Sequence, residues 1–137
     1  MKSLILVLGL VAILSFEGAF AYSGDLTFYY EWRGGYGSCG LERSRYDEFY
    51  VSALSRKWMN LLPNPNNHPL CAADKCIQLW GRRGSVVVKI SDTCEGCKGD
   101  DVDVADSVFP LLDDPNLGRV PVTWEFVNCH TNPPGRR

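Results

Sequence analysis

Long apolar runs are scarce in this chain of 137 residues. The most extended one, from Leu4 to Phe16, is shorter than the stretch of about 20 residues that a membrane-spanning helix needs. Basic residues are not in excess either, because 14 Lys and Arg stand against 16 Asp and Glu, for a net charge of −2. A nucleic-acid-binding domain usually presents a strongly basic face. We therefore expect neither a membrane nor a nucleic acid as a partner.

The sequence also lacks the patterns of common metal sites. The acidic run that begins at Asp101 has Asp106 and Leu112 where a calcium-binding EF-hand loop needs glycine and glutamate. Cys94 and Cys97 have the spacing of half a zinc site, but no second pair of matching spacing accompanies them. A redox role would need a helix within a βαβ unit, which the sequence does not suggest. We expect no metal and no cofactor.

The N-terminal segment has the features of a secretory signal peptide. Lys2 precedes the apolar run, and Ala19-Phe20-Ala21 forms a small-x-small cleavage site. We expect residues 1–21 to be removed and the protein to be secreted and extracellular. Residues 22–130 then form one domain, and residues 131–137, rich in proline and beyond the last cysteine, form a disordered tail.

Six cysteines follow the signal segment: Cys39, Cys71, Cys76, Cys94, Cys97 and Cys129. An even number of cysteines in a short exported chain is typical of a disulfide framework. Six cysteines allow 15 pairings, and the sequence pattern alone does not choose among them. Three disulfides are the expectation at this point.

Short, frequent strand patterns dominate the rest of the chain. Residues 85–91 (SVVVKIS) are β-branched and apolar enough for a strand buried on both faces, with Val86, Val88 and Ile90 on one of them. Asp101–Val104 alternates polar and apolar residues, and residues 119–127 form a last strand. The segment 105–112 resembles one short helix. The pattern predicts an all-β barrel or sandwich with small helices.

Five segments, taken in order, resemble the double-psi β-barrel domain that expansins share with barwin-like proteins, rare-lipoprotein-A proteins and family-45 endoglucanases. They are residues 27–29 (TFY), 37–40 (GSCG), 90–97 (ISDTCEGC), 102–109 (VDVADSVF) and 118–124 (GRVPVTW). The resemblance implies a six-stranded double-psi β-barrel stapled by three disulfides. It also implies the pairs Cys39–Cys71, Cys76–Cys129 and Cys94–Cys97.

The resemblance further implies an open groove that binds polysaccharide. Matched to the family's groove residues, the substrate-binding positions are Thr27 and Tyr29, and the candidate catalytic positions are Asp92 and Asp103. The last motif reads Asp-Val-Ala here, where expansins have Asp-Leu-Ser. The expected partner is a cell-wall glycan such as cellulose, chitin or peptidoglycan, bound and loosened by a monomer without hydrolysis.

Aromatic residues add candidates for stacking on sugar rings, whose apolar faces suit aromatic side chains. Trp32 and Tyr36 lie in a glycine-rich loop, where an aromatic ring is difficult to bury, and both are predicted to bind substrate. Neighbours in a strand point to opposite faces, so we expect Phe28 in the core and Tyr29 in the groove. The same alternation places Trp124 in the core.

Other functions remain open from the sequence. Asp92 and Asp103 could simply accept hydrogen bonds from backbone amides, as loop aspartates often do. A glycoside hydrolase or lytic transglycosylase would use Asp103 as general acid, but the motif that holds the second carboxylate is missing, and Asp25 is the nearest substitute. A barwin-like defence protein or protease inhibitor would present the proline-rich loop Asn60–Pro69 to a protease.

Overall fold

The computed structural model describes residues 21–30, 37–41 and 50–137. Residues 1–20 of the expected signal peptide, and the predicted stacking residues Trp32 and Tyr36, lie outside these ranges. No helix within the described ranges is long and apolar enough to cross a membrane.

Strands make up most of the described chain. In sequence order the elements are β1 (Tyr22–Tyr29), β2 (Val51–Leu54), the 3₁₀ helices η4 (Pro65–Asn67) and η5 (Pro69–Cys71), β3 (Lys75–Gly81), β4 (Gly84–Thr93), β5 (Val102–Ala105), α2 (Phe109–Leu112), the 3₁₀ helix η6 (Pro115–Leu117), β6 (Val120–Asn128) and β7 (Gly135–Arg136). The strands expected over residues 85–91, 101–104 and 119–127 are all present, as β4, β5 and β6.

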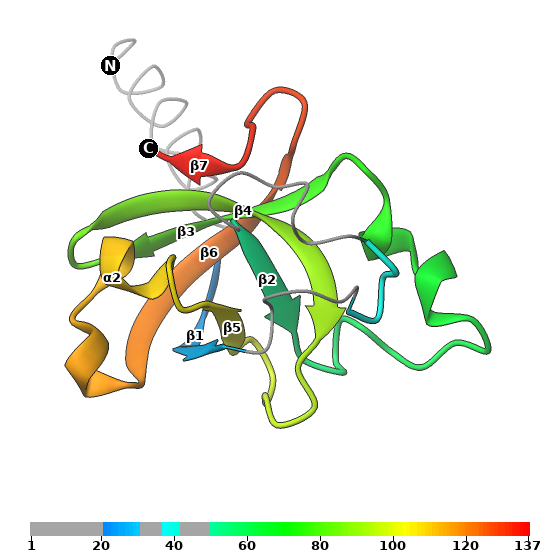
Figure 1. Ribbon diagram of the computed structural model, residues 1–137, viewed down its shortest axis with the longest axis horizontal. Helices are drawn as coiled ribbons and strands as arrows, with labels where there is room; N and C mark the ends of the chain where they lie inside the picture. The colour runs from blue at the N-terminus through cyan, green and yellow to red at the C-terminus, as the bar shows by residue number, and fades with distance from the viewer. Residues whose placement is uncertain (1–20, 31–36, 42–49) are drawn as a thin grey trace, which may run out of the picture.

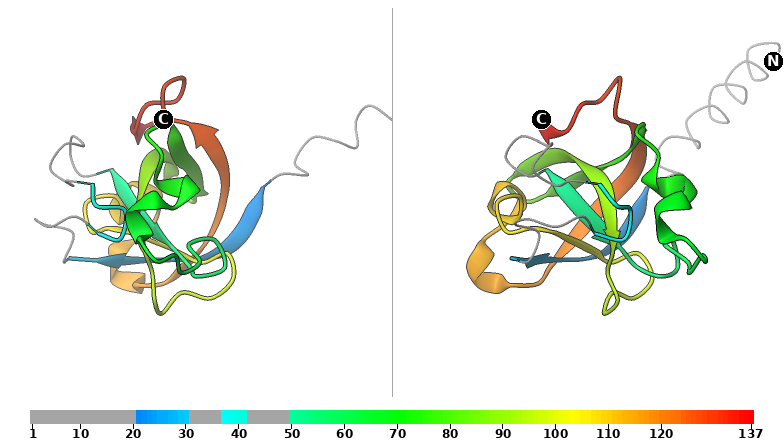
Figure 2. Two further views of the ribbon diagram at one scale, coloured as in Figure 1. Left: turned by 90° about the vertical axis from the view of Figure 1, so that its right-hand side faces the viewer. Right: turned by 45° about the vertical axis from the view of Figure 1, so that its right-hand side comes forward.

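Six of these strands form a closed barrel (Figure 1). Their order is β2-β5-β1-β6-β3-β4, and the pairing of β2 with β4 completes the ring. Two pairings are parallel, β1 with β5 and β2 with β4, and the other four are antiparallel. The connection from β2 to β3 lies outside the barrel wall, as Figure 2 shows. The prediction of an all-β, six-stranded barrel with small helices is confirmed.

The apolar core fills the barrel and continues under α2. Val86, Val88 and Ile90 are fully buried in this core, as the alternation of β4 predicted, and so is Trp124. Val87 belongs instead to a small second cluster on the outer side of the sheet, with the Cys76–Cys129 disulfide. Strand β4 is therefore buried on both faces.

The three disulfides join Cys39 to Cys71, Cys76 to Cys129 and Cys94 to Cys97, which confirms the expected pairing. The first ties the segment before β2 to η5, and the second ties the start of β3 to the residue that follows β6. In the chain-entropy model, closing loops of tens of residues stabilises the fold by about 3–4 kcal/mol for each bond. The third bond closes a tight turn beside β4.

The C-terminal residues 131–137 differ from the disordered tail expected. Gly135–Arg136 forms β7, which pairs antiparallel with Val86 and Val87 of β4. Strand β2 pairs with β4 only from Lys89 onward, so the edge of β4 before Lys89 is open. Strand β7 covers that edge and forms the backbone pairing with β4 that β2 does not supply there.

Lys89 is a charged residue with no solvent exposure. Its Nζ donates a hydrogen bond of 2.8 Å to the carbonyl oxygen of Ile90. Burial lowers the pKa of Lys89 from 10.5 to about 8, and the negative charge of Asp74 offsets part of this effect. The fold therefore carries a lysine whose charged form is disfavoured by its surroundings.

This burial makes the stability of the fold depend on pH. Between pH 8 and pH 10.5 the unfolded chain binds a proton at Lys89 that the folded chain releases, so the free energy of unfolding rises with pH. Denaturant unfolding of the wild type and a Lys89→Met variant should show the wild type gaining up to about 3 kcal/mol relative to the variant over this range. If the difference in unfolding free energy between the wild type and the Lys89→Met variant stays constant with pH, this account of Lys89 is wrong.

Candidate functional site

Four adjacent strands carry one row of residues along the candidate site. Strand pairing joins Thr27 to Asp103, Asp103 to Ala53, and Ala53 to Asp92. Directly paired residues point to the same face of a sheet. Neighbouring strands lie about 4.8 Å apart, so the backbones of the two aspartates are about 10 Å apart, with β2 between them. The small methyl group of Ala53 thus lies between two carboxylates.

This row lines a groove of about 520 Å³ on the outside of the barrel. The lining includes the four predicted binding and catalytic residues that lie within the described ranges, which are Thr27, Tyr29, Asp92 and Asp103. The Cys94–Cys97 turn forms one wall and Arg119 contributes to another side. The structure therefore brings together residues from four strands and one disulfide turn. Their roles in binding stay a prediction.

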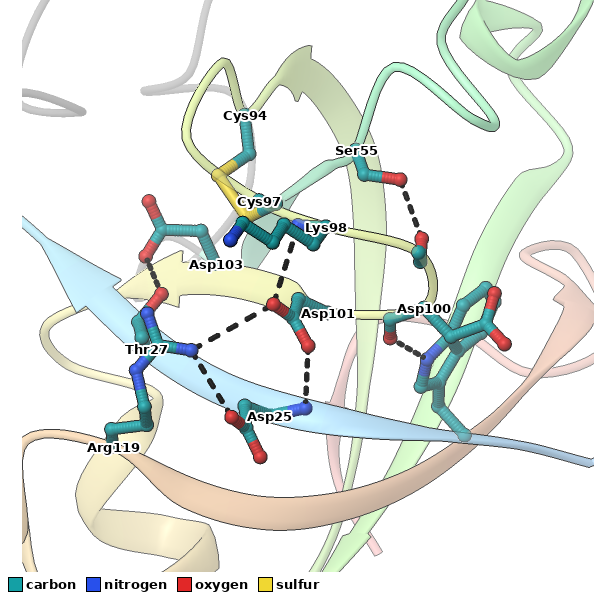
Figure 3. Close-up of polar contacts among 12 residues, drawn as sticks. Asp25, Thr27, Ser55, Cys94, Cys97, Lys98, Asp100, Asp101, Asp103 and Arg119 are labelled. Carbon is teal, nitrogen blue, oxygen red and sulfur yellow. Dashed lines mark hydrogen bonds and ion pairs between the residues drawn. A yellow bond between two sulfur atoms is a disulfide. The ribbon is translucent and has the colours of Figure 1, made fainter.

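The two aspartates have different surroundings. The hydroxyl of Thr27 donates a hydrogen bond of 2.9 Å to Asp103, the contact drawn in Figure 3. Asp92 accepts hydrogen bonds from the backbone amides of Ser38, at 2.9 Å, and Thr93, at 2.8 Å. Asp92 therefore holds the segment around Cys39 against β4, which is the backbone-binding role left open by the sequence. Asp103 contacts a side chain in the groove itself.

The aromatic lining differs in part from expectation. Tyr29 lines the groove, but Phe28 does so too, although neighbours in a strand were expected to point to opposite faces. Both residues are half-buried and pack against the core, and the ring of Phe28 lies 4.8 Å from that of Phe109. Phe28 therefore packs against the core, as expected, and also borders the groove.

Arg119 and Glu95 are charged groups of the groove that the sequence analysis missed. Arg119 approaches Asp25 at 3.2 Å and Asp101 at 3.7 Å (Figure 3). Glu95 forms hydrogen bonds of 2.5 and 2.7 Å with Arg56. These partners are far apart in the chain, so no local sequence signal marks them. The groove thus combines carboxylates with a guanidinium group on its rim.

Known proteins resemble this chain both in sequence and in fold. No family model matches the chain. A papain inhibitor of Streptomyces mobaraensis is 30% identical over 106 residues, which cover 77% of this chain and 71% of the inhibitor. A solved structure of a Streptomyces papain inhibitor has 28% identity and a TM-score of 0.66, and the match covers 80% of this chain and 96% of that one. The chain belongs to the double-psi β-barrel family of this papain inhibitor.

Two further similarities are more distant. The expansin of Clavibacter michiganensis has a TM-score of 0.63 at 22% identity in a mutant complex with cellohexaose, and the match covers 78% of this chain and 50% of the expansin. At this identity the likeness concerns the fold alone. An allergen homologue of Arthroderma benhamiae is 33% identical over 90 residues, which cover 66% of this chain but only 28% of that protein.

In this double-psi barrel, the loop from Cys94 to Asp101 is held against the strands at several points. Ser55 donates to the carbonyl of Gly99 at 2.6 Å, and the indole of Trp124 donates to the carbonyl of Asp100 at 2.8 Å. The carboxylate of Asp101 accepts from the amide of Asp25 at 2.9 Å. Because these contacts fix the loop, one wall of the groove is preformed.

The loop also approaches the backbone of β1 closely. A Cβ atom added at Gly24 would lie 2.3 Å from the carbonyl oxygen of Asp100. Gly24→Ala should therefore push the loop away and lower the free energy of unfolding by about 1–3 kcal/mol, the usual cost of overpacking.

Gly96→Ala is the matched control, because a Cβ atom there would meet nothing within 4 Å in the same loop. Thermal unfolding of both variants tests the expectation. Equal melting temperatures for the two would mean that the loop is not held at Gly24.

Proposed function

We propose that the groove binds a cell-wall-type polysaccharide and loosens its contacts without cleaving a bond. The observation that carries this proposal is the row of Thr27, Asp103, Ala53 and Asp92 along an open groove. Three members of the row are polar, and Ala53 leaves room between them. Such a surface offers hydrogen-bond acceptors to sugar hydroxyls over the width of several strands.

Asp103 is the central polar group of this proposal. A carboxylate accepts strong hydrogen bonds from hydroxyl groups, and Thr27 fixes its orientation through the 2.9 Å contact. Tyr29 and Phe28 provide apolar surface in the same groove. The cellohexaose complex of the expansin supports the proposal, because that protein has the same fold.

The proposal favours loosening without hydrolysis, because the two carboxylates that the sequence offers as partners of Asp103 are already engaged. A glycosidase needs an acid and a base on opposite sides of the scissile bond. Asp25, the nearest substitute in the sequence, forms an ion pair with Arg119 at 3.2 Å. Asp92 is engaged with two backbone amides. Neither carboxylate is placed as a free base opposite Asp103.

We also propose that the protein is exported from the cell, because disulfides form and persist in oxidising compartments and this fold has three of them.

Replacing Asp103 by Asn tests the proposed function. The substitution keeps the size of the side chain but removes its charge, and a hydrogen bond to a charged group contributes about 1.5–3 kcal/mol. Asp103→Asn should weaken binding to cellulose, chitin or peptidoglycan by about tenfold or more, with an unchanged melting temperature. Bound protein and released sugar are measured in the same incubation.

Asp74→Asn is the matched control, because Asp74 is half-exposed outside the groove and lies 4.0 Å from Lys75. It should bind as the wild type does. Wild-type protein that binds none of the three glycans would contradict the proposed function. Released sugar that depends on Asp103 would show that the activity is hydrolytic.

We propose cysteine-protease inhibition as a second candidate function, on the strength of the family and of the loop between β2 and β3. The relative that places the chain in its family is a papain inhibitor. In the loop, Leu61 is 75% exposed and is followed by Leu62 and Pro63. An exposed apolar side chain on a projecting, proline-rich loop suits insertion into a protease cleft.

This loop is held at its base. The Nε2 atom of His68 lies 2.8 Å from Oδ1 of Asn60, and its Nδ1 atom accepts a hydrogen bond from the amide of Leu70 at 3.1 Å. Because Nδ1 accepts, the neutral ring carries its proton on Nε2 and donates it to Asn60. The Cys39–Cys71 disulfide follows directly. A loop fixed in this way loses little entropy on binding.

Inhibition of papain by the purified protein tests the second candidate. Leu61→Ala should raise the inhibition constant by about tenfold, because a buried anchor residue typically contributes more than 1 kcal/mol to an interface. Leu117→Ala serves as the control, since Leu117 is also exposed but lies in η6. Inhibition that is lost equally in both variants, or absent from the wild type, would contradict this role of the loop.

A further inference from the structure

Trp80 is an exposed aromatic residue on the outer face of β3. Of the three tryptophans in the described ranges, Trp124 is fully buried and Trp58 is half-buried, whereas Trp80 is 39% exposed. Its neighbour Leu79 points into the core and is fully buried, so Trp80 points outward. Leaving a large aromatic ring partly in water forgoes free energy that a bound apolar surface would recover.

Hydroxyl-bearing residues lie on both sides of Trp80 in one row across four strands. Trp80 pairs with Thr123 of β6 and with Ser85 of β4, and Thr123 pairs in turn with Ser23 of β1. Ser23 and Thr123 are exposed. Directly paired residues share a face, so these hydroxyl groups and the indole ring lie on the same outer surface.

A trough of about 300 Å³ runs over this surface, with Trp80, Ser23 and Thr123 in its lining. Gly24 and Gly81 also line it. A Cβ atom at Gly81 would lie 2.4 Å from the carbonyl oxygen of Leu112, and one at Gly24 would lie 2.3 Å from that of Asp100. Packing behind the trough therefore requires glycine at both positions.

Arg82 lies at the edge of the trough with a fixed orientation. Its Nε and Nη2 atoms donate to the carboxylate of Asp113, which is 1% exposed, while the Arg82 side chain is 70% exposed. The hydrogen bonds from Arg82 hold the pKa of the Asp113 carboxyl below its usual range. The pair therefore remains charged, and the guanidinium group is held with its remaining N–H donors available to a ligand.

The trough and the groove meet along β1, and Arg119 of the groove lining directly precedes β6. Ser23 lines the trough, and Thr27 and Tyr29, on the same face of β1, line the groove. At about 3.3 Å per residue, Ser23 and Thr27 are about 13 Å apart. On the adjacent β6 side, Arg119 lines the groove and Pro121 the trough. The ion pair of Asp25 with Arg119 lies between the two concavities, and β1, β6 and β3 follow one another in the barrel wall (Figure 1).

We propose that the trough is a second glycan-binding subsite that extends the groove, so that one polysaccharide chain contacts both. This inference rests on the proposed polysaccharide binding in the groove. The indole of Trp80 stacks on the apolar face of a sugar ring, and Arg82, Thr123 and Ser23 form hydrogen bonds with its hydroxyl groups. The expected ligand is a chain long enough to span both concavities, and a disaccharide reaches only one of them.

Binding of hexasaccharides and disaccharides of cellulose and chitin, measured by calorimetry with the full-length mature protein, tests the extension. Trp80→Ala should weaken binding of the hexasaccharide by about two- to tenfold, the range expected for one aromatic stacking contact. Disaccharide binding in the groove should not change. Trp80→Phe, which keeps an aromatic ring, should restore most of the affinity. Leu117→Ala removes another exposed apolar side chain, in η6 outside the trough, and should bind as the wild type does.

The outcomes separate this inference from the proposed function. If Asp103→Asn weakens hexasaccharide binding but Trp80→Ala does not, the groove binds glycan and the extension is wrong. If Trp80→Ala weakens disaccharide and hexasaccharide binding equally, the trough does not extend the groove, and the extension is again overturned. If the wild type binds neither glycan, the proposed function fails and the extension fails with it. Unchanged melting temperatures show that the variants are folded.

Discussion

Strand β2 pairs with both β4 and β5, and the candidate site depends on this double pairing. The pairing closes the sheet into a barrel, and it also sets Ala53 opposite Asp92 on one side and Asp103 on the other. The parallel pairing of β1 with β5 then adds Thr27 to the row. A shift of one residue in any of these registers would turn the side chains to the opposite face of the barrel. The site is therefore specified by the same hydrogen bonds that hold the fold.

Disulfides and close backbone contacts stabilise the segments around this row. The Cys94–Cys97 bond closes the turn that follows β4, and the loop after it packs on Gly24 without room for a Cβ atom. The Cys39–Cys71 bond holds the segment whose Ser38 amide donates to Asp92. The groove thus has preformed walls, which lowers the entropy that a ligand must lose on binding. The Cys39–Cys71 bond also anchors the loop that carries Leu61, so this one disulfide supports both proposed functions.

The strands could be predicted because alternation and β-branched runs are local patterns, whereas the barrel and the groove residues were implied by the resemblance to a family. Alternation and β-branched residues indicated β4, β5 and β6, and the order of short motifs indicated the family and the disulfide pairing. Arg119 and Ala53 were missed because their positions follow from pairing between distant strands. Strand β7, within residues 131–137, was not predicted because its formation depends on an open edge of β4. Trp32 and Tyr36 lie outside the described residues, so their predicted role is untested.

The central claim is that one row of residues across β1, β5, β2 and β4 contacts a polysaccharide. Amide chemical shifts, measured by two-dimensional NMR while cellohexaose or its chitin counterpart is added, test this claim most directly. The account predicts that the largest shifts lie at Thr27, Ala53, Asp92 and Asp103, with smaller ones extending toward Thr123. Shifts confined to the loop around Leu61, or no shifts with either glycan, would contradict it.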